Sequence, residues 1–356
     1  MSGPWMIYGA NGYTGEMIAR EAARRGLKPT LAGRNELKIA PLARELGLDY
    51  RGFDLADPAA VRAGIAGMTL VLHCAGPFSA TARPMMEACI AAGAHYLDIT
   101  GEIAVFELAH ALDAQAREAA VLLCPGVGFD VVPTDCLAAA LKVALPDASR
   151  LALGFDTRGG MSPGTARTSV EGLAQGGRVR RNGRLETVPL AWRTRRIDFG
   201  DGEKLAMTIP WGDVSTAWHT TGIPDIEVYI PASPKLVARL KRMNWIRPVL
   251  GLGPVQTWLK GRIGKTVRGP REEQRARTPT HVWGEVANAA GRVVTGRVKV
   301  ANGYDVTVHA ALGIAAHVLG SAPVAGHLTP SQLVGRDFVE HLPGSGAIRI
   351  EDRGAG

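Results

Sequence analysis

The stretch that decides the fold is Trp5-Met6-Ile7-Tyr8-Gly9-Ala10-Asn11-Gly12-Tyr13-Thr14-Gly15. An apolar run passes directly into three glycines and a helical pattern starts at once, which predicts a strand, a tight turn and a helix. The unpaired N–H groups of a first helical turn attract an anion, and glycine lets a diphosphate approach the backbone closely. We therefore expect a dinucleotide to be bound by Gly9, Ala10, Asn11, Gly12, Tyr13, Thr14 and Gly15.

Strand and helix patterns alternate six times between Trp5 and about Leu145, with short connections. This alternation predicts an α/β fold with a Rossmann-type doubly wound parallel sheet. After Pro146 the pattern changes, with an Asn-Gly turn at 182–183 and an Asp-Gly turn at 201–202. Such turns are typical of hairpins, so we expect an inserted α+β domain with a mostly antiparallel sheet.

Three ranges follow from these patterns. Residues 1–146 are expected to form the dinucleotide-binding domain, and residues 147–303 an inserted domain for substrate binding or dimerisation. The inserted domain should contain a helix from about Thr165 to Ala174 and a hairpin from His281 to Val300. Helical periodicity returns after Tyr304, so we expect residues 304–356 to form C-terminal helices that return to the first domain.

Composition limits the class of protein. The chain has 356 residues, enough for about two domains, and 46% of them are apolar. We expect a cytoplasmic protein, because no signal-peptide pattern opens the chain and no apolar stretch reaches roughly 18 residues. The four cysteines form no C-x-x-C pair, so we expect buried thiols and no metal site.

The positive charge is local. The net charge is +8, but residues 235–277 hold 12 Lys/Arg and 2 Asp/Glu, which leaves a net −2 for the remainder. We therefore expect no nucleic-acid partner. Apolar residues such as Trp245 and Trp258 are interspersed with these cations, and two interpretations remain open. The segment is either a peripheral contact with an anionic membrane or a lid or dimerisation arm with a solvated basic face, and base rates favour the second.

The end of the second predicted strand indicates which dinucleotide is bound. Folds selective for NAD place an Asp or Glu there to accept the ribose 2′-hydroxyl, whereas this chain has Arg34 and Asn35. An arginine can pair bidentately with a 2′-phosphate, and Lys38 adds charge one helical turn later. The sequence therefore predicts NADP, in the form of NADPH, over NAD. Asp54, after the third strand, is placed to accept from the adenine amino group or to cap the next helix.

A glycine–proline turn follows the fourth predicted strand, at the carboxyl end of the sheet where such folds bind ligands. We expect the nicotinamide ribose to be bordered by Cys74, Ala75, Gly76, Pro77 and Phe78.

Five motifs within or near these segments are GANGYTG at 9–15, AGRN at 32–35, AGPF at 75–78, HYLDITGE at 95–102 and PGVGFDVVPTD at 125–135. Together they resemble the saccharopine dehydrogenase-like oxidoreductases, and the most similar branch includes the trans-acting enoyl reductases. The resemblance implies a Rossmann domain, an inserted α+β domain and NADPH-dependent reduction of C=N or C=C bonds. It does not identify the substrate.

Hydride transfer requires the protein to orient the cofactor and the substrate and to supply a proton donor near the strand ends. Our catalytic candidates are Tyr96, Asp98 and Glu102, although either carboxylate could instead cap the following helix. Further groups that could take part are Cys124, Asp130, Asp135, Thr165 and Ser169. The two aspartates could instead anchor the crossover to the second domain, and Thr165 and Ser169 are more simply explained as residues that start a helix.

The sequence thus predicts an NADPH-dependent reductase for an enoyl or imine bond of a small-molecule or acyl substrate, acting as a homodimer. A short-chain dehydrogenase is disfavoured, because none of the six tyrosines is followed by a lysine four residues later. The alternative is a non-catalytic NADP(H) sensor. The large second domain favours an enzyme, because a sensor needs no second wall over the nicotinamide.

Overall fold

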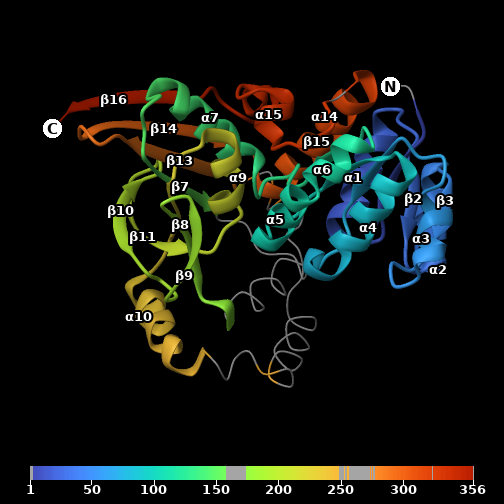
Figure 1. Cartoon of the computed structure of the whole chain (residues 1–356), viewed down its shortest axis with the longest axis horizontal. Coiled ribbons are helices and arrows are strands. Elements are labelled where there is room, and N and C mark those ends of the chain that lie inside the picture. The colour runs from blue at the N-terminus through green and yellow to red at the C-terminus, as the bar shows by residue number, and fades with distance from the viewer. Residues whose placement is uncertain are drawn as a thin grey trace. The chain divides into compact units, whose positions relative to one another are not determined.

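The computed structural model describes residues 3–157, 174–247, 252, 255, 273, 275, 277–322 and 324–355. The chain divides into two compact units (Figure 1). The first unit comprises Met1–Val132 and Tyr304–Gly335, and the second comprises Pro133–Gly303 and Arg336–Gly356. Thr165, Ser169 and nearly all of the helix predicted around them lie outside the described residues, as does most of the basic segment after residue 247.

The first unit contains a parallel sheet of seven strands in the order β15-β6-β5-β4-β1-β2-β3. Its strands are β1 (Trp5–Tyr8), β2 (Thr30–Gly33), β3 (Tyr50–Gly52), β4 (Leu70–His73), β5 (His95–Asp98), β6 (Leu122–Cys124) and β15 (Gly326–His327). Every neighbouring pair in this order runs parallel. The chain moves outward from β1 in both directions, which confirms the predicted Rossmann-type doubly wound sheet.

Helices connect these strands as α1 (Tyr13–Arg24), α2 (Glu36–Leu46), α3 (Pro58–Ile65), α4 (Phe78–Ala92), α5 (Ile103–Ala111), α6 (Asp113–Glu118), α14 (Gly303–Gly320) and α15 (Pro330–Val334). Local signals set their ends. The Asp57 carboxylate caps α3 by accepting from two backbone N–H groups, and Pro58 occupies the first position. Gly47 and Gly93 end α2 and α4 in the left-handed conformation.

Burial on both faces explains why the central strand β1 is apolar throughout. All four residues of β1 are at most 4% exposed. One core cluster joins Met6 and Tyr8 of β1 to Val61 of α3 and Met85 of α4. A parallel sheet covered on both sides needs this composition.

The second unit contains a nine-stranded sheet with the main order β10-β11-β12-β7-β13-β14-β16, to which β8 and β9 add beside β12. Its strands are β7 (Arg150–Thr157), β8 (Gly177–Arg181), β9 (Arg184–Val188), β10 (Thr194–Asp198), β11 (Glu203–Ile209), β12 (Asp225–Pro231), β13 (Thr280–Ala287), β14 (Arg292–Val300) and β16 (Arg349–Ala355). Among the described strands, β12 and β7 run parallel, and the other pairs are antiparallel. This confirms the predicted mostly antiparallel sheet. The turns expected at 182–183 and 201–202 join β8 to β9 and β10 to β11, and the hairpin expected from His281 to Val300 is formed by β13 and β14.

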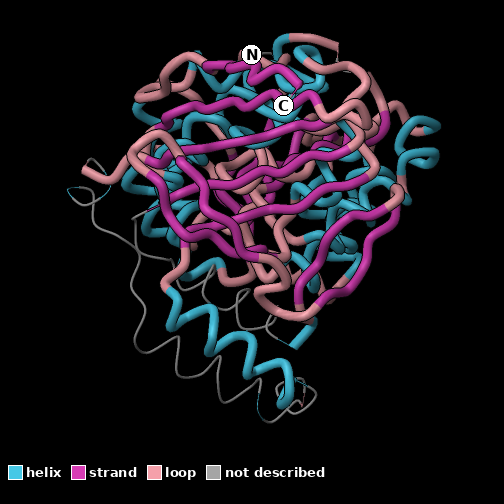
Figure 2. Tube along the Cα trace, turned by 90° about the vertical axis from the view of Figure 1, so that its left-hand side faces the viewer, coloured by secondary structure: helices cyan, strands magenta, loops and turns pink. Residues whose placement is uncertain are grey.

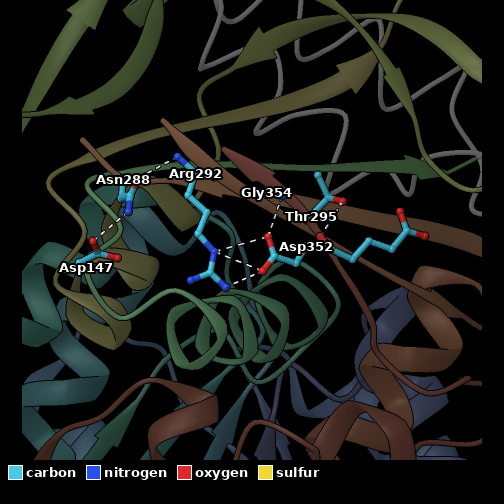
Figure 3. Close-up of polar contacts among 7 residues, drawn as sticks. Asp147, Asn288, Arg292, Thr295, Asp352 and Gly354 are labelled. Atoms are coloured by element: carbon cyan, nitrogen blue, oxygen red, sulfur yellow. Dashed lines mark hydrogen bonds and ion pairs between the residues drawn. The ribbon is translucent and has the colours of Figure 1, made fainter. Parts of the chain in front are cut away.

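The C-terminal residues differ from the expectation for 304–356. α14 and α15 belong largely to the first unit, but β16 pairs with β14 in the second. Side chains reinforce this pairing, because the Arg292 guanidinium donates to Asp352 Oδ1 through Nε and to Oδ2 through Nη2 (Figure 3). The neighbouring Asn288 side-chain amide donates to Asp147 at 2.8 Å in the same view. The C-terminal strand is thus held by partners about 60 residues earlier, which helical periodicity could not indicate.

The second unit also contains the helices α7 (Val132–Ala144), α9 (Asp213–Thr221) and α10 (Pro234–Met243), and the short 3-10 helices η1 (Asn244–Ile246) and η2 (Phe338–His341). α7 moves the unit boundary earlier than the predicted residue 146. It packs on glycines of the sheet, since a Cβ at Gly284 or Gly296 would lie 2.7 or 2.8 Å from the side chains of Leu141 or Leu137. Figure 2 shows this sheet with α10 at its lower edge.

Candidate cofactor site

The turn after β1 brings three backbone segments into close contact. Gly9 has a φ of +87°, and a Cβ there would lie 2.7 Å from the Ala75 backbone nitrogen. A Cβ at Gly15 would lie 2.2 Å from the Gly9 carbonyl oxygen. A side chain at either position would force α1 or the segment after β4 away from β1. Glycine is therefore required at both positions for α1 to begin directly against the sheet.

The first turn of α1 has no side-chain cap. Its N-cap residue is Gly12, whose N–H donates to the Gly9 carbonyl at 3.0 Å. The N–H groups of Gly9 and Ala10 donate to the Ala32 carbonyl of β2 and fix the turn to the sheet. A helix start without a capping side chain presents the positive end of its dipole to a ligand. This arrangement fits the diphosphate of a dinucleotide.

Arg34 stands directly after β2 as an exposed cation. It forms no ion pair or hydrogen bond through its guanidinium among the described residues. Lys38, one turn into α2, is also exposed, and its backbone N–H donates to the Asn35 carbonyl at 3.1 Å. Two unpaired cations at this strand end fit a 2′-phosphate.

The charges of Asp54 and Arg34 both affect the pKa of Tyr8, so these two residues lie at the same end of the sheet. Burial, and to a smaller extent the Asp54 carboxylate, raise the pKa of Tyr8 to about 12, and Arg34 opposes this shift. The Tyr8 hydroxyl donates to the Phe53 carbonyl at 2.9 Å. Asp54 itself accepts from the Ala56 N–H at 3.0 Å. The predicted contact of Asp54 with adenine stays a prediction.

The segment after β4 is held by a buried histidine that the sequence analysis did not single out. The Thr81 hydroxyl donates to the Ala75 carbonyl at 2.7 Å, so it accepts from Nε2–H of His73 at 3.0 Å. Burial lowers the pKa of His73 to about 3, which keeps the ring neutral. The Gly76–Pro77 peptide bond between them is cis. His73 and Thr81 thus fix the backbone of the residues predicted to border the nicotinamide ribose.

Glu102 caps the N-terminus of α4. Its two carboxylate oxygens accept from the Phe78 N–H at 2.9 Å and the Ser79 N–H at 2.7 Å. An anion at this helix end is stabilised by the dipole and by both hydrogen bonds. The sequence left open whether Glu102 caps the helix that follows it. It caps the preceding one, and so fixes the end of the turn at Pro77.

Asp98 joins the segments after β5 and β6. Its fully buried carboxylate accepts from the Tyr96 hydroxyl at 2.7 Å, the Thr100 N–H at 3.0 Å and the Gly126 N–H at 2.8 Å. Burial raises the pKa of Asp98 to about 6, against the effect of these hydrogen bonds. Burial also raises the pKa of Tyr96 well above its ordinary value. These contacts show that Asp98 and Tyr96 position the segments that contain Thr100 and Gly126. A catalytic role for either residue stays a prediction.

Asp130 lies beside the Glu102 segment. A Cβ on Gly101 would come 2.8 Å from a carboxylate oxygen of Asp130, so the missing side chain makes room for this group. Burial, and secondarily the negative charge of Glu102, raise the pKa of Asp130 to about 7. The loop is fixed from α14, where the Thr307 hydroxyl accepts from the Phe129 N–H at 3.0 Å. Asp130 can therefore carry a proton near neutral pH.

Residues 5–124 match the family model of the saccharopine dehydrogenase NADP-binding domain. The first unit contains a saccharopine dehydrogenase-type NADP-binding domain. The match covers the glycine turn, Arg34, and the segments after β4 and β5, and it confirms the recognition and the NADP cofactor predicted from the sequence.

Two relatives of similar sequence extend the comparison. A saccharopine dehydrogenase-like oxidoreductase from Rattus norvegicus is 30% identical over 152 residues, covering 36% of this chain and 35% of the relative. A putative trans-acting enoyl reductase from Mycobacterium tuberculosis is 30% identical over 187 residues, covering 48% and 44%. The chain thus matches less than half the length of each relative.

Among solved structures, the apo saccharopine dehydrogenase (L-Glu forming) from Saccharomyces cerevisiae superposes with a TM-score of 0.70 at 10% identity. The superposition covers 99% of this chain and 100% of that one. At this identity the likeness concerns the fold, and it confirms the α/β class.

The saccharopine dehydrogenase-like first unit brings nearly all predicted site residues to the carboxyl edge of one sheet. Three residues that fix the site, His73, Thr81 and Thr307, were not predicted from the sequence, because their partners lie 8 or more residues away. A signal existed only for His73, a polar residue ending an apolar strand next to the glycine–proline turn. Among the described residues, no helix combines the length and apolar character needed to cross a membrane.

Proposed function

We propose that the chain is an NADPH-dependent reductase of a C=C (enoyl) or C=N (imine) bond in a small or lipid-like substrate. When bound, NADPH supplies the hydride for one atom of the double bond, and the other atom needs a proton. The observation that carries the proposal is the position of the Asp130 carboxyl, which lies beside Gly101 at the edge that carries the glycine turn, where burial raises its pKa to about 7. The enoyl reductase relative from Mycobacterium tuberculosis supports the C=C alternative.

In this proposal each acidic group has one task. Asp130 Oδ gives its proton to the substrate atom that does not receive hydride. Glu102 accepts hydrogen bonds from the N–H groups that follow the Pro77 turn. Asp98 connects Thr100 to Gly126, which precedes Asp130 in the same segment. Asp98, with its Tyr96 partner, and Glu102 therefore act as positioning residues.

The test is NADPH consumption with panels of enoyl thioesters and cyclic imines. Turnover on one panel is expected, and Asp130→Asn should lower kcat by about 100-fold with the NADPH affinity unchanged. The wild-type kcat should fall as the pH rises above about 7, where Asp130 loses its proton. Glu118→Gln, at an exposed site, is the charge-matched control.

Three outcomes separate the alternatives. Tight NADPH binding without turnover on either panel would favour a sensor. Turnover that Asp130→Asn leaves unchanged would retain the reductase and reject Asp130 as the donor. Equal losses in Asp130→Asn and Glu118→Gln would assign the effect to charge alone.

A further inference from the structure

Within the described part of the chain, α10 packs on the second unit through one face. Val237 is 8% exposed and packs with Ala191 and with Met207 of β11, while Leu240 packs against the same cluster. The helix begins at a Ser233 cap, whose hydroxyl accepts from the Leu236 N–H at 3.2 Å. The fold therefore fixes this helix and determines which of its residues face solvent.

The exposed charged side chains of α10 are all cations. Between residues 232 and 247 the chain has five Lys/Arg and no Asp/Glu. The exposed cations are Lys235, Arg239, Lys241 and Arg242. None of these four forms an ion pair within the described part of the chain. Their charge is thus available to an anionic partner.

Large apolar side chains lie exposed beside these cations. Trp245 is 89% exposed, Ile246 53% and Leu236 40%. They are held in this position because the Asn244 side-chain oxygen accepts from the Leu190 N–H at 2.8 Å and its amide donates back to the Leu190 carbonyl. Exposure of the Trp245 indole to water at the end of a basic helix costs free energy, so we expect this surface to bind a partner.

We propose that α10 and η1 form a docking surface for an anionic lipid bilayer. Tryptophan prefers the boundary between headgroups and acyl chains, and aliphatic side chains such as those of Ile246 and Leu236 enter the acyl region. Lysine and arginine extend their charges to the phosphates. A second copy of this surface would bring like charges together, and a nucleic acid would leave the aliphatic groups in water.

The experiment is co-sedimentation of the full chain with vesicles of phosphatidylcholine alone or with about 30% phosphatidylglycerol. Binding is expected only to the anionic vesicles at about 0.1 M NaCl and should weaken several-fold at about 0.5 M. The double variant Lys235→Glu with Arg239→Glu should lower the partition coefficient by at least about tenfold. Trp245→Ser with Ile246→Ser should lower it at both salt concentrations.

The matched control is Lys28→Glu with Lys299→Glu, which changes the net charge equally at two exposed sites away from α10. It should retain binding within about twofold. NADPH binding and far-UV circular dichroism report whether each variant is folded. Three results would each overturn the proposal: wild-type protein that stays in the supernatant with anionic vesicles, an equal loss in the control, or binding to soluble polyglutamate without binding to vesicles.

Discussion

At the residue scale, we expect Arg34 to set the cofactor specificity. Its guanidinium, which pairs with no other described residue, follows β2 where an NAD-selective fold has a carboxylate. Replacing it by alanine removes a charge-assisted contact to the 2′-phosphate, so Arg34→Ala should raise the KM for NADPH by about 10- to 100-fold. The KM for NADH should change by less than about threefold, because NADH has no 2′-phosphate. Steady-state kinetics with both cofactors measures the difference, with Lys28→Ala as control; equal changes would contradict the assignment.

Asp98 makes stability depend on pH. Its pKa in the folded state, about 6, lies above the ordinary aspartate value of about 3.9, so the folded state binds the proton more tightly. Stability is therefore greatest below about pH 4 for this group and falls by about 3 kcal/mol as the pH rises to and beyond 6. Asp98→Asn should remove this fall, because the amide oxygen still accepts from Thr100 and Gly126 and the amide nitrogen can donate to Tyr96.

Urea unfolding between pH 4 and 7 measures the effect as the difference between wild type and Asp98→Asn. Asp98→Ala is the contrasting variant, since it leaves two backbone N–H groups unpaired and should cost at least about 2 kcal/mol at every pH. A parallel pH dependence in wild type and Asp98→Asn would show that Asp98 is not the titrating group. A large loss of kcat in Asp98→Asn, with stability unchanged, would instead support the catalytic role first expected.

At the scale of elements, the contact of α1 with β1 depends on Gly15. A Cβ would lie 2.2 Å from the Gly9 carbonyl oxygen, so Gly15→Ala must displace the start of α1. NADPH affinity should fall by at least about tenfold if the diphosphate binds this turn as predicted. Gly320→Ala is the matched control within α14, where an added Cβ meets nothing within 4 Å. Isothermal titration compares them, and similar affinities for both variants would reject the role of the turn.

What could be predicted from the sequence depends on whether the interacting residues lie close together in the chain or far apart. The turn after β1 was predictable because glycine, strand and helix signals lie within eleven residues. Arg34 was predictable because strand ends converge at one sheet edge. The clamp between His73 and Thr81 was not, since nothing in the pattern shows which hydroxyl meets a buried ring. The position of β16 was missed for a similar reason: its short, charged sequence shows no apolar alternation, and its partner β14 lies far away in the chain.

At the scale of the whole molecule, removal of the C-terminal residues should destabilise the second unit and leave the first unit unaffected. Truncation after Ala347 removes β16 and leaves the β14 edge unpaired in the second unit. The amides of β14 should then lose hydrogen-exchange protection, whereas those of β1 and β2 keep it and NADPH affinity changes by less than about twofold. Arg292→Ala is the control for side-chain effects, because this half-exposed ion pair contributes about 0–1 kcal/mol while the strand pairing remains. The opposite result would be loss of NADPH binding while the amides of β14 stay protected. It would show that the C-terminal residues stabilise the first unit and not the second sheet.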